Sequence, residues 1–107
     1  MHAFLTTVLC SVVFISATAH AEDYILTLKN HEFDPKEITI PANQKVKLII
    51  KNTDGTPAEF ESADLSREKV VHPHSEASVF VGPVEAGRYS FFDDFHRETT
   101  TGTLIAK

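Results

Sequence analysis

The sequence predicts an all-β domain built as an antiparallel sandwich or barrel. In several short stretches apolar residues alternate with polar ones, which is the pattern of strands buried on one face. Turn-forming residues separate these stretches at short intervals, as they do in antiparallel β-proteins. We expect turns at Asp34-Pro35, Pro41-Ala-Asn43, Asp54-Gly55, Gly82-Pro83 and Ala86-Gly87.

Each strand is expected from residues that share one face. These sets are, in chain order, Tyr24, Leu26 and Leu28; Ile38 and Ile40; Val46, Leu48 and Ile50; Ala77, Val79 and Val81; and Tyr89 and Phe91. A short strand is also expected around Phe60, and a last one over 101–106, which is rich in β-forming residues. The segment 62–69 is ambiguous: Asp64 could cap one helical turn there, or the segment could be a plain loop.

The N-terminal segment has the pattern of an export signal. Residues 4–15 form an apolar run, and Ala19 and Ala21 supply the small residues of a cleavage site. A transmembrane anchor is the alternative, but the run is too short to span a hydrocarbon core of ~30 Å and lacks basic flanks. We therefore expect a signal peptide over 1–21 and one exported domain over 22–107, without a membrane span.

The charge and the sulfur content limit what the mature domain can bind. No charged residue precedes Glu22, so the domain carries the whole net charge of −5. This acidic balance argues against nucleic acid and anionic membranes as partners. The one cysteine, Cys10, and the one methionine, Met1, both lie in the expected signal peptide. The mature domain is therefore expected to have no disulfide and no sulfur ligand.

Four local motifs occur in the order typical of one family of small β-proteins. They are Phe33-Asp-Pro35 before Ile38-Thr-Ile40, Pro41-Ala-Asn-Gln-Lys-Val46, Lys51-Asn-Thr-Asp-Gly-Thr-Pro57 and Glu85-Ala-Gly-Arg-Tyr89. Together with the tail from Gly87 to Lys107, they resemble the motifs of the cupredoxins, and the resemblance implies a Greek-key β-sandwich. Asn43 stands where the family has a turn glycine, and asparagine tolerates positive φ.

The resemblance also indicates which copper ligands are missing. Asp93 stands where the family has its cysteine, and His96 keeps the histidine of the same loop. The first histidine would fall near Ala58 or Glu59, and threonines fill the methionine region at 99–101. Because a type 1 copper centre needs a thiolate and two imidazoles, we expect no such centre.

Within the family, the chain resembles most the small periplasmic cupredoxin-like proteins of bacterial ferrous-iron uptake. The similarity is carried by Asn30-His-Glu-Phe-Asp-Pro35, Glu59-Phe-Glu-Ser62, Arg67-Glu-Lys-Val70 and Phe92-Asp-Asp-Phe-His96. It implies a periplasmic accessory that handles or oxidises Fe(II), with an iron permease or a periplasmic iron-binding protein as partner. A ferroxidase would need an electron acceptor that the sequence does not name, so enzymatic activity stays an open alternative.

In a cupredoxin sandwich, the loops after the first and third strands and before the last strand meet at one end. This packing would bring together His31, Glu59, Asp93 and His96, with Glu61 and Asp94 nearby. Such nitrogen and carboxylate ligands suit Cu(II) or Fe, without strong discrimination among metals. We therefore predict metal ligands at His96, Asp93, His31, Glu59 and Glu61. The alternative is that Asp93 and His96 form a hydrogen bond that only fixes the loop.

A metal-free docking module for a membrane permease or a partner subunit is the second hypothesis. Phe92 or Phe95 could then contact the partner beside the retained histidine. The acidic residues would steer a cationic partner or simply face solvent; they are Glu59, Glu61, Asp64 and Glu68. His72-Pro-His74 is a separate candidate for surface Cu(II) or Ni(II), since residues i and i+2 share a face in an extended chain.

Overall fold

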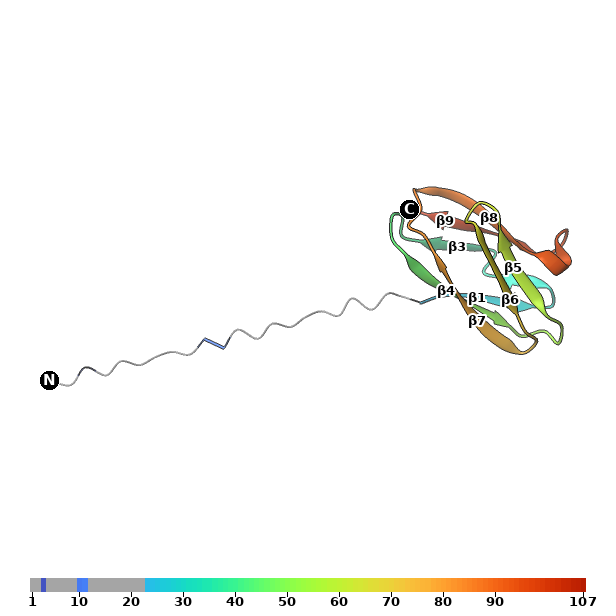
Figure 1. Cartoon of the computed structure of the whole chain (residues 1–107), viewed down its shortest axis with the longest axis horizontal. Helices are drawn as coiled ribbons and strands as arrows, with labels where there is room; N and C mark the ends of the chain where they lie inside the picture. Colours follow the sequence, from blue (N-terminus) through green and yellow to red (C-terminus); the bar gives the residue numbers. More distant parts are fainter. Residues whose placement is uncertain (1–2, 4–9, 12–22) are drawn as a thin grey trace.

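Two β-sheets pack face to face and form a sandwich (Figure 1). The structure is a computed structural model that describes residues 3, 10, 11 and 23–107, so the expected cleavage after Ala21 and, isolated residues apart, the signal peptide lie outside the described residues. The first sheet contains, in spatial order, β2 (Glu32–Asp34), β1 (Asp23–Lys29), β4 (Val46–Asn52) and β7 (Ser75–Val81). The second contains β3 (Glu37–Ile40), β9 (Thr101–Ala106), β8 (Gly87–Asp93), β5 (Ala58–Ser62) and β6 (Arg67–Val71). The predicted β-sandwich is confirmed.

The sheets are mixed, whereas turn spacing alone predicts antiparallel pairing throughout. β1 pairs with β4 in parallel, and so does β3 with β9, while the neighbouring pairs run antiparallel. The chain leaves the first sheet after β2, forms β3 in the second sheet and returns as β4. Parallel neighbours require such a crossover, because a tight turn can join only antiparallel strands.

The apolar faces predicted from the alternation form the core between the sheets. Leu26, Leu48, Phe60 and Leu104 are at most 1% exposed. Burying a side chain of this size stabilises the fold by about 1.5–3 kcal/mol. The core is therefore the main support of the loops at the two ends of the sandwich.

A glycine permits the closest packing beneath one of these ends. A Cβ atom on Gly102 would lie 2.4 Å from ring atoms of Phe91. Without it, the Phe91 ring packs edge-on against Phe33, with centroids 5.0 Å apart, and against Phe60 at 5.3 Å. These aromatic contacts join both sheets directly under the loop that precedes β9.

The prediction for residues 62–69 is wrong in its second half. Arg67–Val71 forms the edge strand β6, in which Val71 alone is buried, so the strand lacks the alternation that reveals other strands. Asp64 caps no helix; its Oδ2 accepts hydrogen bonds from the backbone N–H and the hydroxyl of Ser90. The short hairpin strand β2 was likewise not predicted.

A 3-10 turn, η1 (Asp94–His96), connects β8 to the loop before β9. Asp93 caps it by accepting the N–H of Phe95. Within the described part of the chain, no helix is long and apolar enough to cross a membrane. The connection that matches the metal loop of the family is thus a compact, capped turn at the end of the sandwich.

Candidate metal site

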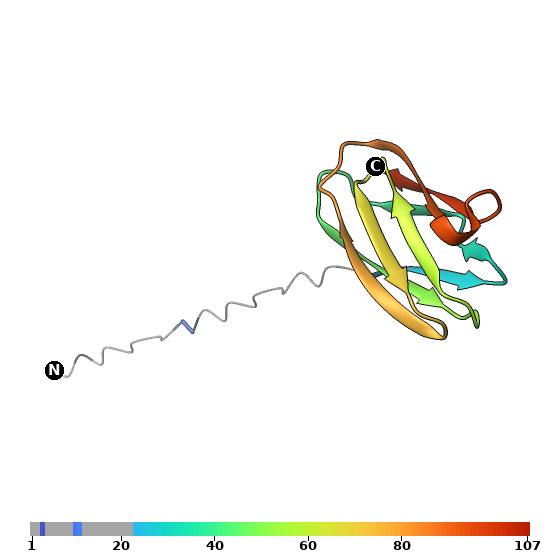
Figure 2. The ribbon, with the colours of Figure 1, turned by 45° about the vertical axis from the view of Figure 1, so that its right-hand side comes forward.

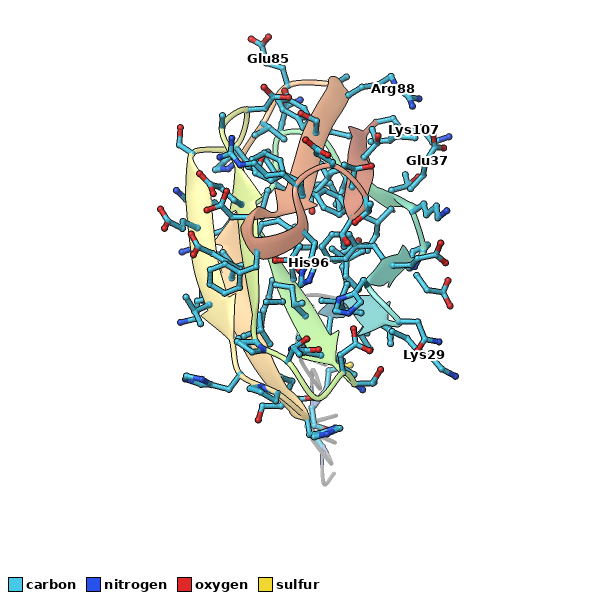
Figure 3. The ribbon with its side chains drawn as sticks, turned by 90° about the vertical axis from the view of Figure 1, so that its right-hand side faces the viewer. Lys29, Glu37, Glu85, Arg88, His96 and Lys107 are labelled. Atoms are coloured by element: carbon cyan, nitrogen blue, oxygen red, sulfur yellow. The ribbon has the colours of Figure 1, made fainter. Side chains whose placement is uncertain are left out.

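Two histidines meet at the end of the sandwich that carries η1. The β1–β2 turn and η1 lie at this same end in two views (Figures 1 and 2), and Figure 3 looks onto it with His96 near the centre. The ring centroids of His31 and His96 are 4.1 Å apart, and the ring planes are inclined by 35°. The structure therefore brings together two imidazoles that are separated by most of the chain.

Asp93 fixes the ring of His96. Its side chain is 1% exposed, and its Oδ2 lies 3.0 Å from Nδ1 of His96. Its Oδ1 accepts the backbone N–H groups of Glu59, at 2.9 Å, and Phe95, at 3.1 Å. Both carboxylate oxygens are thus occupied. Asp93 acts here as an orienting partner, which directs the other ring nitrogen, Nε2, away from the carboxylate.

Thr100 ties the two histidine-bearing segments together. Its side chain is fully buried, and its hydroxyl donates to the backbone carbonyl of His31 at 2.6 Å. Its own N–H donates to the carbonyl of His96, and its carbonyl accepts the N–H of Asp93. A residue in the threonine-filled methionine region therefore couples the β1–β2 turn to the loop.

His31 occupies a left-handed backbone conformation. Lys29 pairs with Glu32, so Asn30 and His31 are the two central residues of a hairpin turn. Their φ angles are 51° and 58°. Hairpin turns of this kind favour Asn followed by Gly, because both residues need positive φ. A histidine at the second position is an unusual choice, which points to its side chain rather than to the turn.

Asp54 in the β4–β5 connection holds this turn. Its Oδ1 accepts the N–H of Asn30 at 2.7 Å, and its Oδ2 accepts the N–H of His31 at 3.0 Å. The same Oδ2 lies 3.8 Å from Nδ1 of His31. Burial opposes ionisation of Asp54, but the two N–H donors and both imidazoles outweigh it and lower the pKa of this carboxyl below its usual range.

Glu59 and Glu61 do not join the histidines through their carboxylates. Ala58, Phe60 and Ser62 of β5 point into the core, so Glu59 and Glu61 lie on the outer face of the sheet. There the two carboxylates gather with Asp94, with oxygens within 4.8 Å of one another. Glu59 reaches Asp93 through its backbone N–H instead. The predicted ligand set is therefore divided between an inner histidine site and an outer acidic cluster, Glu59, Glu61 and Asp94.

The outer acidic cluster already has a cationic neighbour. Nε of Arg97 lies 2.6 Å from Asp94, and its guanidinium is 4.0 Å from Glu61 and stacks over the ring of Phe92. The pKa of Arg97 is raised, first by its hydrogen bond to Asp94. The cluster is thus partly neutralised by the protein itself.

Glu59 is the most strongly perturbed acid of this face. A hydrogen bond to the neighbouring Glu68 carboxyl, together with burial and nearby negative charges, raises the pKa of Glu59 from 4.5 to about 7. Burial and the charges of Asp94 and Glu68 also raise the pKa of Glu61. Because the folded pKa of Glu59 exceeds its unfolded value, its contribution to stability is present below about 4.5 and is lost as the pH rises through about 7.

Replacing Glu59 by Gln should therefore stabilise the domain in neutral and alkaline solution. We expect a higher melting temperature than the wild type at pH 8 and an equal one near pH 4.5, because the amide cannot acquire the repelled charge. Thermal unfolding followed by circular dichroism at both pH values measures this. Glu85→Gln, an exposed change before the start of β8, is the control. A Glu59→Gln protein less stable than the wild type at pH 8 would contradict the prediction.

The two imidazoles of the inner site are open to solvent. The side chains of His96 and His31 are 34% and 44% exposed, so solvent reaches both rings. Among the described residues, neither Nε2 atom has a hydrogen-bond partner. The residues do not fit a type 1 copper centre, since the loop offers no sulfur and Asp93 is committed to three hydrogen bonds.

Sequence reasoning missed the role of Asp54. The sequence predicts only a turn at Asp54-Gly55, because the partners of Asp54 in the β1–β2 turn are 23 and 24 residues away along the chain. His72 and His74 flank the β6–β7 turn, where the N–H of His74 donates to the carbonyl of Asp54. This contact involves only the backbone of His74, so the pair His72 and His74 stays a prediction.

The sandwich and the histidine in the loop between β8 and β9 define a domain of the blue-copper type of fold. The chain belongs to the cupredoxin-like domain family, whose model matches residues 2–106. The predicted family is thus confirmed.

Solved structures agree with this assignment. The domain is similar to auracyanin A, a "blue" copper protein of Chloroflexus aurantiacus, with a TM-score of 0.70 and 16% identity over 80% of this chain and 98% of that one. It is also similar to amicyanin of Paracoccus versutus, with a TM-score of 0.65 and 17% identity over 85% of this chain and 87% of that one. At such identities the likeness establishes the fold alone.

A relative by sequence is an uncharacterized protein of Rickettsia prowazekii. It is 44% identical over 80 residues, which are 75% of this chain and 64% of the relative. The chain therefore spans less than two thirds of the length of the curated relative that it matches. The family and the fold of this chain are established, whereas its activity depends on the residues of the site.

Proposed function

We propose that the protein is an exported, periplasmic metal-binding accessory that binds Cu(II) or Fe through His31 and His96, without a type 1 copper centre. The observation that carries the proposal is the approach of the two imidazoles to 4.1 Å, with a carboxylate beside Nδ1 of each ring. Histidine ligands commonly donate their other ring nitrogen to a carboxylate, which orients the ring and raises its basicity.

The donor atoms favour a borderline divalent metal. With Asp93 occupied by hydrogen bonds, the proposed protein ligands are two imidazole nitrogens, and water or a substrate would complete the coordination sphere. Imidazole suits Cu, Zn, Fe and Ni, and Cu(II) binds most tightly in the divalent series. Carboxylates that surround a metal without binding it still favour its positive charge. We therefore expect the site to bind Cu(II) more tightly than Fe.

We further propose that this metal binding serves ferrous-iron uptake. It is supported by the similarity of four motifs in this sequence to those of the small cupredoxin-like proteins of iron-uptake systems. In this role the protein would receive or oxidise iron before permeation, with an iron permease or a periplasmic iron-binding protein as partner. The acidic outer face beside η1 is compatible with either a cationic partner surface or Fe(II) itself.

The decisive test is a titration of the mature domain, 22–107, with Cu(II) and Fe(II). We expect His96→Ala to lose most of the binding, because one of the two ligands is gone, whereas His72→Ala keeps it. Isothermal titration calorimetry measures both. A wild-type protein that binds neither metal more tightly than about 1 mM would overturn the proposal.

A docking module is the second candidate, and one observation favours it. Phe95, on η1 beside His96, is 49% exposed, so its ring is available to a partner at the end of the sandwich that carries the two histidines. If docking is the whole function, cells with His96→Ala should take up iron like the wild type, and cells with Phe95→Ser should not. The opposite pattern supports the metal site.

A further inference from the structure

We infer that Asp54 is a positioning residue of the metal site, holding the β1–β2 turn so that the ring of His31 faces that of His96. The inference rests on the proposed function. One carboxylate accepts the N–H groups of both central turn residues, at 2.7 Å from Asn30 and 3.0 Å from His31. No other contact of comparable geometry holds these two N–H groups within the described chain.

The turn needs such an anchor because its conformation disfavours histidine. Asn30 and His31 have φ angles of 51° and 58°, a region in which residues other than glycine are uncommon. Sparsely populated backbone conformations persist only where the surrounding structure holds them, and they concentrate at functional sites. Asp54 supplies the interaction that holds the turn, and the proposed role of the turn is to present the imidazole of His31.

Asp54 is itself held firmly. Its N–H donates to the Oδ1 atom of Asn52 at 3.0 Å, and Asn52 is 2% exposed. The Asn52 amide donates in turn to three backbone carbonyls, those of Thr56, Val71 and His72. The carbonyl of Asp54 accepts the N–H of His74. The anchor is therefore fastened to the ends of β4 and β6, which makes it rigid relative to the sandwich.

Asp93 and Asp54 each place a carboxylate near one of the two imidazoles. Asp93 lies 3.0 Å from Nδ1 of His96, and Asp54 lies 3.8 Å from Nδ1 of His31. Each imidazole thus has a carboxylate near its Nδ1 atom, and each ring keeps Nε2 for a ligand. Asp93 acts mainly on its ring, whereas Asp54 acts mainly on the backbone beneath its ring.

The test compares Asp54→Asn with Glu32→Gln. Asparagine keeps one acceptor oxygen, but its NH₂ group faces the second N–H, so the turn loses one hydrogen bond and the negative charge. Glu32→Gln removes an equal charge from the residue after His31 and leaves the anchor intact. We expect Asp54→Asn to weaken Cu(II) affinity about tenfold or more, and Glu32→Gln to leave it within about twofold. The probe is Cu(II) alone, measured by calorimetry.

A spectroscopic readout separates positioning from general destabilisation. Electron paramagnetic resonance of the Cu(II)-loaded protein should show two coordinated nitrogens in the wild type and in Glu32→Gln, and one in Asp54→Asn. If Asp54→Asn does not fold, the amide protons of Asn30 and His31 in the metal-free wild type still report the anchor, through slow hydrogen exchange. Two results would overturn this inference and leave the proposed function standing. In the first, the wild type binds Cu(II), and Asp54→Asn has the same affinity and the same spectrum. In the second, the amide protons of both Asn30 and His31 exchange fast. A wild type that binds no metal overturns the proposed function and, with it, this inference.

Discussion

Asp93→Asn should reduce metal affinity by a factor of about 10–100. The amide is nearly isosteric, and its oxygen can keep the two backbone N–H groups of Glu59 and Phe95, which Oδ1 now accepts at 2.9 and 3.1 Å. The NH₂ group must then occupy the place of Oδ2, 3.0 Å from Nδ1 of His96. It donates where a carboxylate accepted, so Nδ1 becomes an acceptor and the proton moves to Nε2. A protonated Nε2 cannot bind a metal.

The cost to stability should be similar to the cost to binding, because a factor of 10–100 in affinity corresponds to about 1.4–2.7 kcal/mol. Loss of a charge-assisted hydrogen bond in a buried place is expected to lower the free energy of unfolding by about 1–3 kcal/mol. Calorimetric titration with Cu(II) measures the affinity, and urea unfolding measures the stability. Asp94→Asn is the matched control, because Asp94 is the next residue and contacts Arg97 rather than a histidine. If Asp93→Asn kept the wild-type Cu(II) affinity and Asp94→Asn lost it, the metal site would have to be the outer acidic cluster.

The strands were predictable because alternation reports burial directly. The apolar positions of the alternating pattern are also the buried positions in the structure, as at Leu26 and Leu28 in β1 and at Leu48 and Ile50 in β4. β6 was not predictable in this way, since an edge strand with a single buried residue has no alternation to read. Parallel pairing was not predictable for another reason. It depends on where the chain passes from one sheet to the other, which local sequence patterns do not encode.

The site was predictable only as far as a motif marked it. Asp93 and His96 stand at positions that the resemblance singles out, and the structure places them in contact. Glu59 and Glu61 were expected beside them because all these residues belong to one end of the fold. The alternation around Phe60 already required both glutamates to point the same way, and the direction follows from the burial of Phe60. Asp54 could not be found, because its partners lie on a distant turn.

His31→Gly should abolish one ligand of the site while leaving the fold as stable as before or more stable. The backbone at this position has a φ of 58°, which glycine adopts without the steric cost that a Cβ atom brings. Relief of this strain is worth about 1 kcal/mol. The side chain that is lost is 44% exposed and lies 3.8 Å from its carboxylate partner, so its own contribution to stability is small.

The comparison with His31→Ala isolates the backbone effect. Both variants lose the imidazole, and both should therefore lose most Cu(II) affinity, but alanine retains the Cβ atom in the left-handed conformation. We expect His31→Gly to be more stable than His31→Ala by about 1 kcal/mol in urea unfolding. A histidine that costs stability at this position agrees with a binding role, since stability and function are often opposed at functional sites. Equal affinity of His31→Gly and the wild type would show instead that His31 is not a metal ligand.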